Sequence, residues 1–305
     1  MLLIADENNF NTRLDVFLSQ LYDGISRSKI QSAIKDGRVT INGENKKPSY
    51  TLKIDDRVEF ENLTPEKNIE LEAQDIPLEV VWEDENMAVI NKPSGMLTHP
   101  TFIETKDTLV NALLYKYGDN LSDTNGEFRR GIVHRLDRNT SGLLMIAKNN
   151  KTHEYLANLI KDHKLTKKYH AVLKGFYPNE NDIISEPIGR NNVNPKKMAV
   201  RPDGRPSLTK LKVLEHFGNE ATYVELELVT GRTHQIRVHT SYKNHPVYND
   251  TLYGAGEGKV KTQEQVLQSF YLKFAKPFSS SIIELEIEPD EKLSKVLKYF
   301  RSRRA

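Results

Sequence analysis

Apolar residues recur at helical spacing near the start of the chain. The pattern predicts a first helix near residues 14–21 and a second helix over residues 27–35, each with its apolar residues on one face. Ser26 is a suitable N-cap for the second helix, and Asp36 and Gly37 are suited to end it. The chain therefore opens with a pair of short amphipathic helices.

The pattern then changes to the alternation typical of β-strands. Residues 38–41 alternate between polar and apolar, the dipeptide Asn42-Gly43 is a hairpin turn signal, and residues 50–60 supply more strand. Residues 11–61 are therefore predicted to form a small α+β domain.

Residues 62–77 lack periodicity and contain two prolines and several glutamates, so we expect an acidic linker here. The larger domain is expected over residues 78–305, which is long enough to bury a sizeable core. A helix could begin at Gly231 or Thr233. The other elements predicted by period are strands at 78–82, 87–90, 143–147, 165–175, 208–217, 221–229 and 282–287, helices at 108–117, 151–164 and 292–300, and a polar, basic excursion at 179–205.

Composition excludes several classes of protein. The chain has no cysteine, which rules out disulfides, thiolate nucleophiles and cysteine-ligated zinc. The histidines form no HExxH motif, and we expect no metal. The N-terminal apolar run is too short for a signal peptide and no run of eighteen apolar residues exists, so we expect a cytoplasmic protein without a membrane partner.

Charge is unevenly distributed although the net charge is only +2. Residues 53–85 hold twelve acidic and three basic residues, whereas residues 129–174 hold eleven basic and three acidic ones. Such segregation fits an anionic polymer that approaches one face. The alternative is a solvated surface without a partner.

The basic region contains the stretch GIVHRLDRNTSGLLMIAKN at residues 131–149. Here Asp137 lies between Arg135 and Arg138, on a predicted loop before a buried strand. Nearby positive charge favours the ionised carboxylate, which suits a nucleophile or a base rather than an acid. The alternative is a group of solvated surface ion pairs.

This stretch resembles the catalytic motif of the RluA-type RNA pseudouridine synthases, His-Arg-Leu-Asp-x-x-Thr-Ser-Gly. The strings VVWEDENMAVINKPSGMLTHP and TGRTHQIRVH, followed by HPVYNDTLYG, continue the resemblance over nearly the whole chain. It implies an α+β catalytic domain with a mixed, largely antiparallel central sheet flanked by helices. It also implies that uridine in structured RNA, either large-subunit ribosomal RNA or transfer RNA, is isomerised to pseudouridine without a cofactor.

The resemblance also assigns roles to residues. Asp137 would be the catalytic carboxylate, Tyr169 would stack on the target base and help to remove its C5 proton, and Arg237 would pair with Asp137. Whether the carboxylate attacks the sugar or removes a sugar proton stays open. The residues expected to bind the substrate are Arg135, which would fill the gap left by the flipped base, Ile236, which would pack beneath the site, Arg138 and His134. For His134 the alternative is a hydrogen-bonded core histidine.

The segment SRSKIQSAIKDGRVTINGENKKPSYTLKIDD resembles the RNA-binding domain of the ribosomal-protein S-four type. The basic residues that match it are Arg13, Arg27, Lys29, Lys35 and Arg38. The alternative for them is a basic helical hairpin without a ligand.

The larger domain departs from the residues common in the catalytic family at three positions, Asn249, Gln268 and Ser207. These departures bear only on local packing or on RNA contacts.

Two other functions compete with this interpretation. The first is a non-catalytic RNA-binding factor for ribosome assembly that retains the fold. The second is a carboxylate hydrolase that acts on a small substrate, for which the charge segregation and the RNA-binding domain would be superfluous. We take a monomer as the default oligomeric state.

Overall fold

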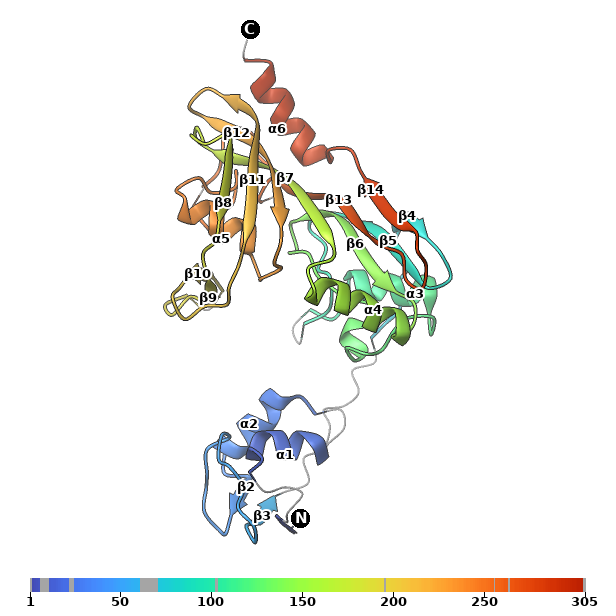
Figure 1. The fold of residues 1–305 in the computed structure, drawn as a ribbon, viewed down its shortest axis with the longest axis vertical. Coiled ribbons are helices and arrows are strands. Elements are labelled where there is room, and N and C mark those ends of the chain that lie inside the picture. Colours follow the sequence, from blue (N-terminus) through green and yellow to red (C-terminus); the bar gives the residue numbers. More distant parts are fainter. Residues whose placement is uncertain are drawn as a thin grey trace. The chain divides into compact units, whose positions relative to one another are not determined.

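The computed structural model describes residues 2–5, 11–21, 25–60, 71–101, 104–194, 196–254, 256–262 and 264–303. The chain divides into two compact units, residues 1–70 and 71–305, which are described separately (Figure 1). No helix in these described ranges has the length and apolar character needed to cross a membrane.

The first unit packs two helices, α1 (Leu14–Leu21) and α2 (Arg27–Lys35), on a three-stranded antiparallel sheet. The sheet has the order β1 (Leu2–Ile4), β3 (Arg57–Phe60) and β2 (Val39–Ile41). Both helices lie where the apolar pattern predicted them, and the Ser26 side chain accepts the Lys29 N–H as expected of an N-cap. The strand expected over residues 50–60 covers only Arg57–Phe60, and β1 was not predicted.

The expected linker falls partly outside the described residues, which resume at Leu71. From there the chain lies against the second unit: the Gln74 N–H donates to the Asn111 carbonyl, and the Asn111 side-chain amide donates to the Glu72 carbonyl. Residues 71–77 therefore belong to the second unit by contact, and the functional domain boundary stays a prediction.

The second unit is built on a nine-stranded sheet, in which all pairs are antiparallel except β13 with β6. The order is β4-β5-β6-β13-β7-β12-β11-β8, and β14 also pairs with β13. This confirms the predicted mixed, largely antiparallel sheet. The strands are β4 (Glu79–Glu83), β5 (Met87–Lys92), β6 (Ser141–Ala147), β7 (Thr166–Lys174), β8 (Asn181–Ile184), β11 (Thr209–Phe217), β12 (Ala221–Leu228), β13 (Leu267–Ala275) and β14 (Ile282–Glu286).

Helices cover this sheet. They are α3 (Leu109–Tyr117), α4 (Asn150–Lys161), α5 (Gln235–Tyr242) and α6 (Glu291–Arg301), with a short 3₁₀ helix, η1 (Glu127–Arg129). Strand β6 is buried on both faces: Leu144 and Ile146 join one core cluster, whereas Leu143, Met145 and Ala147 join another that contains α4. A strand that is buried on both faces is apolar at successive positions, and this continuous apolar run is the pattern from which the strand was predicted.

Three details differ from the sequence predictions. Strand β13, which runs between β6 and β7 (Figure 1), was not predicted. The excursion at 179–205 is not all loop, because it contains β8 and a hairpin of β9 (Ile188–Arg190) with β10 (Met198–Val200). Helix α5 does not begin with a cap at Gly231 or Thr233; its N-cap is His234, in a left-handed conformation and without a side-chain cap.

The parallel contact between β6 and β13 requires a glycine. Gly142 pairs with Ser269, its φ is +110°, and a Cβ there would lie 2.1 Å from the Ser269 carbonyl oxygen. Only glycine adopts this conformation readily and leaves this space. The loop before β6, which carries Asp137, is thereby held close to β13 and to its neighbour β7.

Candidate active site

The Asp137 loop is fixed by two lysines that bind its backbone, of which Lys92 is fully buried and Lys292 is half-buried. Lys92 Nζ donates to the carbonyls of Arg138, Pro93 and Met96 at 2.8–3.1 Å. Lys292 Nζ donates to the Asn139 carbonyl at 2.7 Å. Burial lowers the pKa of Lys92 to about 7 and that of Lys292 to about 8. The turn that presents Asp137 is thus held by side chains from β5 and α6.

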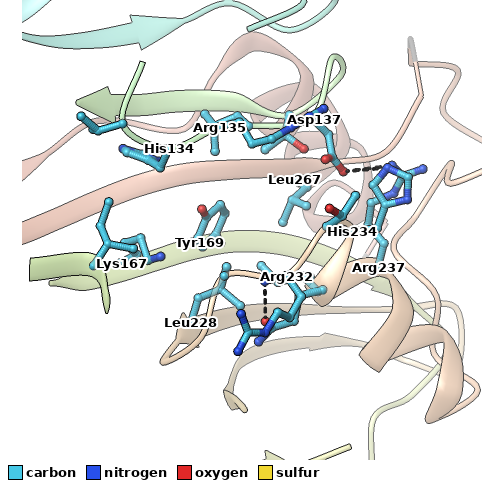
Figure 2. Close-up of a pocket in the computed structure, with 18 residues that line it drawn as sticks. His134, Arg135, Asp137, Lys167, Tyr169, Leu228, Arg232, His234, Arg237 and Leu267 are labelled. Carbon is cyan, nitrogen blue, oxygen red and sulfur yellow. Dashed lines mark hydrogen bonds and ion pairs between the residues drawn. The ribbon is translucent and has the colours of Figure 1, made fainter. Parts of the chain in front are cut away.

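Asp137 accepts a hydrogen bond from Arg237, and a second carboxylate, that of Asp250, binds the other side of the same guanidinium group. Arg237 Nη1, on α5, donates to Asp137 Oδ2 at 3.0 Å (Figure 2). Its Nε and Nη2 donate to the two oxygens of fully buried Asp250 at 2.7 and 3.0 Å. Burial acts to lower the pKa of Arg237, but hydrogen bonds from the guanidinium to Asp250 and the charges of both aspartates outweigh it and raise the pKa. The guanidinium is therefore a permanent, oriented partner for Asp137.

His234 faces the same carboxylate. Its Nε2 lies 3.8 Å from Asp137 Oδ2, and its Nδ1 lies 2.8 Å from the Tyr253 hydroxyl. That hydroxyl accepts the Met198 N–H, so its own proton is free to go to Nδ1. The proton of the neutral imidazole then lies on Nε2, toward Asp137. Burial lowers the pKa of His234, against the opposing charge of Asp137.

Asp137 lines a cavity of about 250 Å³. Tyr169 lies at its centre in Figure 2, with Leu228, Leu267 and Ile236 among the apolar lining. This volume is below the roughly 300–1,000 Å³ of pockets for drug-sized ligands, so it suits one small ring-shaped group. Burial raises the pKa of Tyr169 to about 12, so its phenol stays protonated at neutral pH.

The cavity brings together most residues that the sequence singled out. Asp137, Tyr169, Arg237, His134, Arg135 and Ile236 all line it. Arg138 does not: its side chain is exposed and forms an ion pair with Glu104. The side chain of Arg135 is exposed and forms no hydrogen bond or ion pair with any residue that the structure describes.

His134 has a structural contact as well. Its Nε2 accepts the Met145 N–H at 3.0 Å, which ties the motif to β6. Burial, with a smaller contribution from Lys167, lowers the pKa of His134 to about 3, so the ring is neutral. His134 therefore makes the structural hydrogen bond that the alternative interpretation expected, and its ring also lines the cavity.

In the first unit, buried Asp15 binds two of the five predicted basic residues. Arg13 and Arg27 both donate to it at 3.0–3.1 Å, and the hydrogen bond from Arg13 contributes most to a pKa of Asp15 well below its usual range. Both arginine side chains remain about half exposed. Lys35 is exposed on α2, Arg38 pairs with Asp36 at 3.7 Å, and Lys29 lies on the same helix. The arginines are thus pre-positioned with their guanidinium edges accessible.

Sequence reasoning missed three residues of the site. His234, Asp250 and Tyr253 were not singled out, although they lie in the strings TGRTHQIRVH and HPVYNDTLYG that carried the family resemblance. Asp250 also accepts the Tyr253 N–H, and the Tyr253 ring lies 5.0 Å from the Arg237 guanidinium carbon. Across the described ranges, no group of three or more His, Asp or Glu residues is arranged to hold a metal ion.

Comparisons with known proteins agree with this geometry. A model of the family "RNA pseudouridylate synthase" matches residues 86–242, and a model of the S4 domain matches residues 12–58. An uncharacterized RNA pseudouridine synthase of Bacillus subtilis is 37% identical over 98% of this chain and 97% of its own. The ribosomal large subunit pseudouridine synthase D of Zymomonas mobilis is 36% identical over 96% of this chain and 95% of its own.

A solved structure supports the same assignment. Human RNA pseudouridylate synthase domain containing 1 has a TM-score of 0.57 and 27% identity, and the match covers 74% of this chain and 95% of that one. Together with the site and the S4 domain, these matches define an enzyme that acts on RNA. The chain belongs to the RNA pseudouridylate synthase family, whose reaction isomerises uridine in RNA to pseudouridine.

Proposed function

We propose that Asp137 is the group that reacts with the ribose of the target uridine, and that Arg237 keeps it charged and oriented. The observation that carries this proposal is the 3.0 Å hydrogen bond between the two side chains, both of which line the cavity. The base lies over Tyr169, with Ile236 packed beneath the site. Because burial keeps the Tyr169 phenol protonated, stacking is its main role, and removal of the C5 proton by a phenolate is disfavoured.

The target uridine must leave its helix to reach this cavity, at a cost of a few kcal/mol. The exposed Arg135 guanidinium at the cavity fills the vacated position, because a planar cation stacks on bases and holds phosphate. His134 and Arg138 contribute from the same loop, His134 by shaping the cavity and Arg138 by contacting phosphate at its edge. The isomerisation changes no oxidation state, so it proceeds without cofactor or metal.

The substrate is proposed to be large-subunit ribosomal RNA, with transfer RNA as the alternative. Relatives that are about as long as this chain and similar along most of it carry the name ribosomal large subunit pseudouridine synthase D. The enzyme is proposed to act as a monomer in the cytoplasm.

Mapping of pseudouridines in total RNA tests this assignment. RNA from cells that lack the gene is expected to lose one or a few pseudouridines in large-subunit ribosomal RNA, and the chain supplied on a plasmid should restore them. Loss of sites confined to transfer RNA would reassign the substrate. An unchanged map would favour the non-catalytic assembly factor.

The S4 domain is proposed to bind the RNA backbone through Arg13, Arg27, Lys29, Lys35 and Arg38. Replacement of both Arg27 and Lys35 by alanine should reduce the slope of log affinity against log salt by about one to two, since each lost phosphate contact releases fewer counterions. Filter binding over a salt series measures this slope.

The matched control is Lys53→Ala with Arg57→Ala, two exposed basic residues of the same unit that do not match the S4 pattern. This double variant should keep the original slope. Equal slopes for the two double variants would place the RNA on another surface.

A further inference from the structure

Lys167 is a buried cation that lines the cavity. It lies on β7 two residues before Tyr169, on the same face of the strand, and is 7% exposed. Within the ranges that the structure describes, its ammonium group forms no hydrogen bond or ion pair. Among the described residues that line the cavity, Asp137 is the one carboxylate, and Arg237 already binds it. A buried charge without a partner is costly, which points to a ligand that completes it.

The ammonium group lies at the end of the cavity away from Asp137. A Cβ added to Gly231 would come within 3.3 Å of Lys167 Nζ, which places Nζ against the loop between β12 and α5. In Figure 2, Tyr169 lies between Lys167 on one side and Asp137 on the other. Neutral His134 and the apolar side chains of Ile160 and Leu228 line the cavity with it. A base stacked on Tyr169 with its ribose at Asp137 would therefore direct its far edge toward Lys167.

We propose that Lys167 donates a hydrogen bond to the uracil carbonyl opposite the ribose and so stabilises the uracil anion that forms when the base leaves the sugar. This inference rests on the proposed function, which places the ribose at Asp137 and the base over Tyr169. In uridine, the carbonyl opposite the ribose is O4, because C4 lies across the ring from N1.

The chemistry of the isomerisation explains why a cation belongs at this end. When the N1–C1′ bond breaks, its electron pair leaves with the base, and uracil carries one negative charge shared by N1, O2 and O4. The sugar becomes neutral again by bonding to Asp137 or by losing a proton to it. When C5 then bonds to C1′, the bond from C1′ to Asp137 breaks, or the sugar takes its proton back from Asp137, and the base becomes neutral. Loss of the C5 proton and uptake of a proton at N1 then give pseudouridine. A fixed donor at the site of developing charge lowers the barrier.

The position also suits the rotation of the base. Half a turn about the axis through N3 and C6 exchanges N1 with C5 and O2 with O4. A carbonyl oxygen therefore lies opposite the ribose both before and after the turn, and one ammonium group can bind each in succession. Burial lowers the pKa of Lys167 to about 8, so the charged form still predominates at pH 7.

The substitution Lys167→Met tests the proposal, with Lys168→Met as its matched control. Lys168 is the next residue of β7, points to the opposite face and pairs with Glu225 at 3.0 Å. Lys167→Met should lower kcat about 10²-fold with little change in KM, and should raise the melting temperature, because an unpaired buried charge is removed. Lys168→Met should keep the activity of the original chain.

A synthetic RNA with 4-thiouridine at the mapped target position identifies the contact. Sulfur is a weak acceptor, so the ratio of kcat between the original chain and Lys167→Met should shrink from about 10² to below about 10 on this RNA. An undiminished ratio, a rise in KM at constant kcat, or a lower melting temperature together with lost activity would each overturn the proposal. An active Asp137→Asn variant would instead overturn the proposed function, which keeps the two failures distinct.

Discussion

Replacement of Asp137 by asparagine is expected to reduce pseudouridine formation by about 10⁴-fold or more, while RNA affinity stays nearly unchanged. The amide has the shape of the carboxylate, and its oxygen can still accept the hydrogen bond from Arg237. It is, however, neither a nucleophile nor a base toward the sugar. Nucleoside analysis of RNA incubated with the purified chain measures the product.

Glu154→Gln provides the control for this experiment. Glu154 is an exposed carboxylate on α4, outside the cavity lining, and its amide variant should modify RNA at the original rate. If the Asp137→Asn variant kept normal activity, the Asp137 carboxylate would have no part in the mechanism, whatever the result for Glu154→Gln.

Replacement of Arg237 by methionine is expected to abolish activity and to lower the free energy of unfolding by about 3–5 kcal/mol. Arg237 is 6% exposed, and its loss would leave Asp250, which is fully buried, without its cationic partner. Breaking a buried pair costs more than the pair contributes, because one charge remains desolvated. Urea denaturation followed by tryptophan fluorescence measures the change.

The double variant Arg237→Met with Asp250→Leu separates stability from catalysis. It removes both buried charges, so most of the lost stability should return, whereas activity should not return because Asp137 still lacks its partner. A stable single variant, or a double variant as unstable as the single one, would contradict the proposed role of this ion pair.

The sequence predicted most of the helices because their signals are local. An N-cap hydroxyl and an apolar stripe lie within a few residues of each other, as with Ser26 and Thr108, both of which cap the predicted helices. Strand β13 was missed because Gln268 and Ser269 interrupt its apolar pattern. These polar side chains are buried, and they are satisfied by the distant carbonyls of Glu288 and Leu143. No local pattern reveals such partners.

The candidate site was only partly predictable, because several of its contacts also join residues that are far apart in the sequence. The charge pattern suggested that the arginines beside Asp137 in the sequence would be its partners, but Arg138 turns away to Glu104. The family resemblance, not the spacing, indicated Arg237, one hundred residues further along the chain. Asp250 and His234 act through geometry that arises only after folding, including the left-handed backbone of His234.

The insertion of β13 between β6 and β7 has a consequence for synthesis of the enzyme. The segment that closes the wall beside Asp137 and Tyr169 is separated from β6 by more than a hundred residues, so the contact order of this sheet is high. A growing chain cannot assemble the reactive cavity until residue 275 has left the ribosome tunnel. The enzyme is therefore inactive during most of its own translation, even though its S4 domain emerges before the catalytic domain.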